Sequence, residues 1–148
     1  MGVIEYLEWL GKSMGKEYQD NFKEFSGRRK NLHAAMQAIQ EYEQVLSERL
    51  ISGLQVFPDV QIAGISNKKN FSRRVPTVSF TVKNKNPQII AQKLADENIY
   101  VWHGHNYALE AIHLMGVENS GGVIRIGPVH YNTIQEIDRT LEVLGTCL

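Results

Sequence analysis

The stretch VPTVSFTVK, residues 75–83, constrains the fold most, because its side chains alternate between apolar and polar. The apolar members are Val78, Phe80 and Val82, and the polar members are Thr77, Ser79 and Thr81. A period of two is typical of a half-buried strand. This stretch is therefore predicted to be a strand in a sheet with a core on one side.

Two helices are predicted before this strand. Apolar residues at helical spacing indicate a first helix over about residues 3–14. A stripe of apolar side chains with a period of 3.6 residues predicts a long amphipathic helix from about residue 26 to residue 53. The run VQIAGI at 60–65 follows this helix and is a second candidate strand.

Helices and strands alternate in the second half of the chain. An N-capping asparagine followed by proline predicts a helix at 87–98, and IYVWH at 99–103 is the next strand. Asn106 is predicted to cap a short helix that reaches Met115. The run VIRIGPV at 123–129 is the last candidate strand.

The final helix, TIQEIDRTLEVL, is predicted to start at a capping box formed by Thr133 and Glu136. The order of elements is thus ααββαβαβα. Strands separated by helices of unequal length indicate an α+β fold, with a small mixed or antiparallel sheet of about four strands and helices packed mainly on one face. A chain of 148 residues is expected to form a single domain over residues 1–148.

The charge balance argues against a nucleic-acid or membrane partner. Sixteen basic and sixteen acidic residues cancel, so no net field attracts the chain to either. The basic clusters at 28–30, 68–69 and 73–74 lie at predicted element boundaries, where we interpret them as solvated ends. No basic leader and no apolar run of membrane-spanning length is found, and the single cysteine, Cys147, fits a reducing, cytoplasmic setting.

Three histidines, His103, His105 and His113, raise the question of a metal site. The first two are two residues apart and would share a face of a strand, but the sequence offers no obvious fourth ligand and no usable cysteine. Histidines that fill hydrogen-bonding positions at a turn are the preferred interpretation. The turn Gly104-His105-Asn106 also precedes a predicted helix, where free backbone N–H groups favour an anion, although a simple capping turn is the preferred interpretation.

Arg125 is a charged residue inside an otherwise apolar strand, between Ile124 and Ile126. Arginine is almost never fully buried without a partner. Its guanidinium must therefore reach a carboxylate, a ligand or water. Two roles are open, a structural salt bridge and the bidentate grip of a substrate carboxylate.

Three segments resemble a known enzyme family. VPTVSF, IYVWHGHNYA and VIRIGPVHYNTIQEIDRTLEVL look like the C-terminal part of class V aminotransferases of the cysteine desulfurase type. Those enzymes close with a strand like PTVSF, a loop gI-v-x-x-GHHCA and an ending R-x-S-x-x-x-YNT-x-EEID. The resemblance covers nearly the whole chain and implies the small domain of a fold-type I transferase dependent on pyridoxal phosphate.

The resemblance also implies roles for four residues. Arg125 would grip the α-carboxylate of a small amino-acid substrate, while His105, Asn106 and Tyr107 would form one wall of the substrate pocket. The family forms dimers and carries pyridoxal phosphate on a lysine of a large domain, so a homodimer is implied for the intact enzyme. No residue of this chain is expected to be catalytic, to bind the cofactor or to bind a metal.

The sequence departs from the family in two ways. Tyr107 stands where GHHCA has its nucleophilic cysteine, so no thiol is present to accept sulfur. The chain is more similar to a desulfurase-like branch with the patterns VW-x-G-x-YYA and RxGxxHYNT, which Trp102, His130 and Tyr131 match. The family's Schiff-base lysine and phosphate cradle precede the matched region, so we expect the large cofactor-binding domain to be absent and this chain to be inactive alone.

Two functional hypotheses follow. The first is a C-terminal fragment of a cysteine desulfurase-like enzyme, which contributes the carboxylate-binding arginine and one wall of the active site. The second is a free-standing module that associates with itself or with a partner, because a domain without its neighbour exposes apolar surface. Trp9, Trp102 and Tyr107 are the candidate contacts for such an association.

Overall fold

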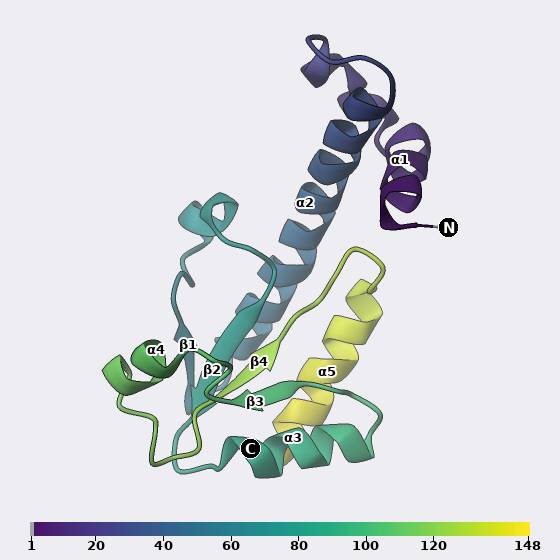
Figure 1. Ribbon diagram of the computed structural model, residues 1–148. Coiled ribbons are helices and arrows are strands. Elements are labelled where there is room, and N and C mark those ends of the chain that lie inside the picture. Colours follow the sequence, from purple (N-terminus) through teal and green to yellow (C-terminus); the bar gives the residue numbers. More distant parts are fainter. Residues whose placement is uncertain (1) are drawn as a thin grey trace. The chain divides into compact units, whose positions relative to one another are not determined.

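Strand β2 (Val78–Val82) lies inside a four-stranded sheet, between β1 (Val60–Ala63) and β4 (Val123–Ile126). The edge strand β3 (Trp102–Gly104) pairs with β4 and completes the order β1-β2-β4-β3 in this computed structural model, which describes residues 2–148 (Figure 1). Every pairing is antiparallel, so the antiparallel form of the two expected sheets is the correct one.

One face of the sheet is covered by α2 (Gly27–Leu54), α3 (Pro87–Asp96) and α5 (Ile134–Cys147). The sheet contributes Val78, Phe80, Val82, Ile124 and Ile126, and the helices contribute Leu46, Leu50, Ile51, Leu54, Ile90, Leu94, Ile137, Leu141 and Leu144. Burial of this apolar area is the main driving force for the fold. The predicted α+β arrangement is confirmed, and α4 (Leu109–Leu114) lies apart from α3 and α5 (Figure 1).

The predicted helix starts are confirmed at α3 and α5. The Asn86 side chain accepts a hydrogen bond from the backbone N–H of Gln88 at 2.8 Å, and Pro87 takes the first helical position. At α5, the Thr133 hydroxyl accepts from the Glu136 N–H at 3.2 Å, and the Glu136 carboxylate accepts from the Thr133 N–H at 2.7 Å. This capping box lowers the pKa of Glu136, above all through the backbone N–H of Thr133.

Two predictions near residue 105 were wrong. The strand expected at 99–103 pairs only over Trp102–Gly104. Asn106 does not cap α4, because Ala108 takes the N-cap position and offers no side-chain hydrogen bond. The reason is an additional turn, in which the N–H of Ala108 donates to the carbonyl of His105 at 2.8 Å before the helix begins.

The described chain divides into two compact units, of which the first ends at Glu43. In it, α1 (Val3–Ser13) packs on the first part of α2 through a small cluster of Leu10, Ala35 and Ile39, and the 3-10 helix η1 (Lys16–Phe22) connects the two helices. A Cβ on Gly11 would overlap the carbonyl of Asn31, so this crossing requires glycine. The sheet and its helices form the second unit, residues 44–148.

Arg74 corrects the interpretation of the basic clusters as solvated ends. It follows the 3-10 helix η2 (Lys68–Arg73), and its guanidinium donates to the carbonyls of Ile65 and, at 2.8 Å, Thr77. Partial burial lowers the pKa of this group. Arg74 therefore links the segment before η2 to the start of β2.

Among the helices within residues 2–148, none combines the length and the apolar character needed to cross a bilayer.

Candidate functional site

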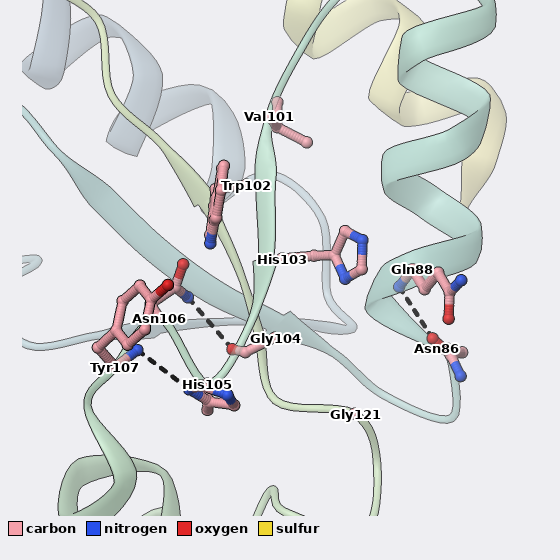
Figure 2. A pocket seen from close by; sticks show the side chains of 10 residues that line it. All are labelled: Asn86, Gln88, Val101, Trp102, His103, Gly104, His105, Asn106, Tyr107 and Gly121. Atoms are coloured by element: carbon pink, nitrogen blue, oxygen red, sulfur yellow. Dashed lines mark hydrogen bonds between the residues drawn. The ribbon is translucent and has the colours of Figure 1, made fainter.

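A pocket of about 720 Å³ opens beside the edge strand β3 and the loop that follows it. It is lined by Asn86, Gln88, Val101, Trp102, His103, Gly104, His105, Asn106, Tyr107 and Gly121. Figure 2 shows Trp102, Asn106 and Tyr107 on one side of β3, and His103 with the start of α3 on the other. The structure thus brings the three loop residues singled out in the sequence to one pocket.

Local hydrogen bonds hold the loop from Gly104 to Tyr107. The Asn106 amide nitrogen Nδ2 donates to the Gly104 carbonyl at 3.2 Å, and the Tyr107 N–H donates to Nδ1 of His105 at 3.0 Å (Figure 2). Because Nδ1 of His105 is an acceptor, the neutral ring carries its proton on Nε2. His105 can therefore offer an N–H donor to a ligand.

The same loop carries local energetic costs. Asn106 and Tyr107 have φ of 50° and 59°, in the left-handed region, which costs roughly 1–2 kcal/mol for a side chain such as tyrosine. The Oδ1 atom of Asn106 is buried and has no hydrogen-bond partner within residues 2–148, although buried polar atoms are normally paired. Strain and unsatisfied polar atoms of this kind cluster at functional sites.

The double glycine before β4 brings that strand close to the loop. Gly122 has φ of 86°, and the carbonyl of Gly104 fills the place that a Cβ on Gly122 would take. Gly121 lines the pocket beside Asn86 and Pro87. Gly122 therefore permits a close backbone approach between the end of β3 and the start of β4.

Arg125 is exposed, although Val123, Ile124 and Ile126 around it are buried. Its side chain points away from the helix-covered face, because alternate residues of a strand lie on opposite faces. Within residues 2–148 it has neither an ion-pair nor a hydrogen-bond partner, so the structural salt bridge, one of its two possible roles, is not formed.

The sheet register gives Arg125 its neighbours. Ser79 of β2 lies directly opposite Arg125 on one side, and Trp102 of β3 lies directly opposite it on the other. Residues paired in this way share a face, so Ser79, Arg125 and Trp102 form a row across three strands. Trp102 also lines the pocket, whereas Arg125 and Ser79 are not among its lining residues.

The histidines do not gather as metal ligands. β3 ends at Gly104, so His105 leaves the strand and does not share a face with His103, contrary to the expectation from their spacing. Nδ1 of His113 lies 3.0 Å from the Glu118 carboxylate. Across residues 2–148, no three His, Cys, Asp or Glu side chains are arranged to hold a metal ion.

Sequence reasoning missed three residues of this region. The sequence pattern indicates only a helix start for Asn86 and Gln88, but both line the pocket. It predicts only a strand for Ser79, which lies opposite Arg125. The Asn-Pro dipeptide was visible in the sequence, but nothing in it connected residue 86 with the loop near residue 105. That connection depends on how α3 packs beside β3.

Pyridoxal phosphate, which the sequence resemblance implies, needs a lysine for covalent attachment. Among the described residues that line the pocket there is no lysine. The lining therefore does not fit a covalently held pyridoxal phosphate by itself, although it offers hydrogen-bond donors and aromatic surface.

Comparisons with known sequences place these observations in a family context. The sequence model of the aminotransferase class-V family matches residues 31–140. An aminotransferase-like protein of Gibberella zeae is 34% identical over 113 residues, which are 75% of this chain and 28% of that protein. An uncharacterized protein of Mycobacterium tuberculosis is 28% identical over 143 residues, 97% of this chain and 32% of that protein. The chain thus spans less than a third of either curated relative.

Solved structures show the same arrangement of strands and helices. A cysteine desulfurase from Thermococcus onnurineus has a TM-score of 0.64 and 25% identity, over 82% of this chain and 30% of that one. A NifS-like protein from Rickettsia africae has a TM-score of 0.62 and 25% identity, over 80% and 32%. The resemblance recognised in the sequence is confirmed.

Proposed function

Because this chain belongs to the aminotransferase class-V family, we propose that it is the C-terminal part of a longer pyridoxal-phosphate enzyme and holds the carboxylate of an amino-acid substrate. The match to less than a third of each curated relative supports this proposal. The cofactor would be held by a large domain outside this chain, in a homodimer, where it supplies an electron sink for bonds at the substrate α-carbon. This chain would contribute binding and orientation.

The observation that carries the proposal is that the Arg125 guanidinium is exposed and has no partner within residues 2–148. A planar fork of N–H donors matches the two oxygens of a carboxylate, and the resulting charge-assisted bonds are stronger than neutral ones. An arginine with no internal partner can form these bonds without first breaking an ion pair. The hydroxyl of Ser79, which pairs with Arg125 in the sheet register, would add a further donor.

The loop residues would form one wall of the substrate site. His105 would donate through Nε2, and Asn106 and Tyr107 would face the substrate from the same side of β3 as Trp102 (Figure 2). A phenol hydroxyl cannot replace a thiol as an acceptor of sulfur. The proposed enzyme therefore acts on an amino acid without passing sulfur through residue 107.

Carboxylate binding can be tested on the purified chain by nuclear magnetic resonance. Titration with propionate should shift the side-chain Nε–H resonance of Arg125, and Arg125→Gln should weaken binding at least about tenfold because a charge-assisted fork is lost. Arg73→Gln is the matched control, since Arg73 is also an exposed arginine of the second unit. Unchanged propionate binding in Arg125→Gln would overturn the proposal.

A second candidate function is association through exposed apolar surface. Trp102 is 57% exposed, Tyr107 is 90% exposed and Leu114 of α4 is 83% exposed, which is unusual for such large side chains. Trp9 of the first unit is 54% exposed. Sedimentation equilibrium of the chain separates the candidates, because a monomer at high concentration is incompatible with self-association as its function.

A further inference from the structure

We infer that Trp102 selects the substrate of this site, by stacking on an aromatic or large apolar group attached to the carboxylate that Arg125 holds. The inference rests on the proposed carboxylate site and adds the class of amino acid that the site accepts. Its basis is the pairing of Trp102 with Arg125 across β3 and β4.

The register places the side chains of Trp102 and Arg125 next to each other on one face of the sheet. Directly opposed residues of an antiparallel pair have Cβ atoms about 4.5–5.5 Å apart and project from the same face. If a carboxylate bound to the Arg125 guanidinium directs the rest of its molecule toward β3, that part therefore passes the Trp102 ring. Trp102 is 57% exposed, so its ring surface is available to a ligand.

The row is chemically asymmetric around Arg125. On the β2 side stands the small, polar Ser79, and on the β3 side stands the large, apolar indole of Trp102. Within this row, an amino acid with its carboxylate on Arg125 gains apolar contact by directing its side chain toward Trp102. Figure 2 shows Tyr107 on that same side of β3, where it provides a second aromatic ring.

The charges of the pocket exclude one class of side chain. Among the described residues that line it there is no aspartate or glutamate, and the neighbouring Arg125 is cationic. A lysine-like or arginine-like side chain would meet repulsion with no counter-charge. An amino acid with an uncharged aromatic or large apolar side chain therefore suits both Arg125, which binds its carboxylate, and Trp102, which contacts its side chain.

The experiment compares two monocarboxylates that differ only in a phenyl group, propionate and 3-phenylpropionate. Their Kd values are measured from the Arg125 Nε–H and Trp102 indole N–H resonances of the whole chain. The wild-type chain should prefer 3-phenylpropionate by about tenfold, the range expected of aromatic stacking together with apolar burial. Trp102→Ala should reduce this preference to about twofold or less, because the loss of affinity falls mainly on 3-phenylpropionate.

Three controls make the outcomes distinct. Trp102→Phe should keep most of the preference, because it retains a stacking surface, and Trp9→Ala should keep all of it. A full tenfold preference in Trp102→Ala overturns the selection role while the carboxylate site stands, provided that Arg125→Gln weakens both ligands. If Arg125→Gln leaves both Kd values unchanged, or if neither ligand shifts Arg125, the carboxylate site itself fails and the selection role with it.

Discussion

The carbonyl of Gly104 occupies the space that a Cβ atom on Gly122 would need. This contact joins the last residue of β3 to the residue that precedes β4, at the start of the loop that lines the pocket. Gly122 also has φ of 86°, in the region that favours glycine. Two independent constraints therefore require glycine at this position.

Gly122→Ala should destabilise the second unit by about 2–4 kcal/mol, because left-handed strain is added to a clash with rigid backbone. Urea unfolding measures the loss. Gly64→Ala is the matched control, since Gly64 has φ of 81° with open space around it, and it should cost only about 1–2 kcal/mol. Equal losses in the two variants would show that the contact with Gly104 is unimportant.

Replacement by glutamine should change the free energy of unfolding little at Arg125 and much more at Arg74. Arg125→Gln should change the free energy of unfolding by less than about 0.5 kcal/mol, because an exposed side chain without partners is removed. Arg74→Gln should cost about 1.5–3 kcal/mol, because charged hydrogen bonds to the carbonyls of Ile65 and Thr77 are lost. Thermal unfolding of both variants gives the comparison, and a large loss in Arg125→Gln would reveal a structural role that the contacts do not show.

The capping box of α5 should make stability depend on acid pH. Hydrogen bonds from Thr133 hold the pKa of Glu136 below its ordinary value of 4.5 in the folded chain. The ionised form is thus favoured by folding, so its contribution is complete above pH 4.5 and is lost as pH falls through the lowered pKa. Glu136→Gln should therefore flatten the decline of stability in this window, as followed by urea unfolding at a series of pH values.

Glu142→Gln is the control for this pH dependence. Glu142 is an exposed carboxylate on the same helix and has no hydrogen-bond partner among the described residues. Its replacement should leave the pH profile close to that of the wild type. A profile equally flattened by both substitutions would mean that the effect comes from net charge and not from the cap.

Gly11→Ala should disrupt the packing of α1 on α2 in the first unit. A Cβ at residue 11 would overlap the carbonyl of Asn31. Because the overlapping atoms of Asn31 belong to the backbone, no flexible side chain can move aside. The expected loss is about 2–4 kcal/mol for this unit, despite the higher helix propensity of alanine. Hydrogen exchange of the α1 amides measures this loss of stability. Val3→Ala, at an exposed position of the same helix, is the control. Unchanged protection in Gly11→Ala would contradict the close crossing.

Local sequence patterns predicted most of the elements but not all of their limits. The alternation at 78–82 and the capping residues Asn86 and Thr133 depend on neighbours within a few positions, and the structure confirms them. The strand expected at 99–103 was displaced because Ile99 and Val101 pack against the core, so their apolar character reflects burial and not strand pairing.

The sequence by itself determined the order of helices and strands, the capped helix starts and the family. It also singled out Arg125, because a charge in an apolar strand is visible without a structure. Only the tertiary structure decided that Arg125 faces away from the core, that Trp102 and Ser79 lie opposite it, and that α3 lines the pocket. The physical reason is that register and pockets arise between segments far apart in the chain, whereas propensity and capping act within one segment.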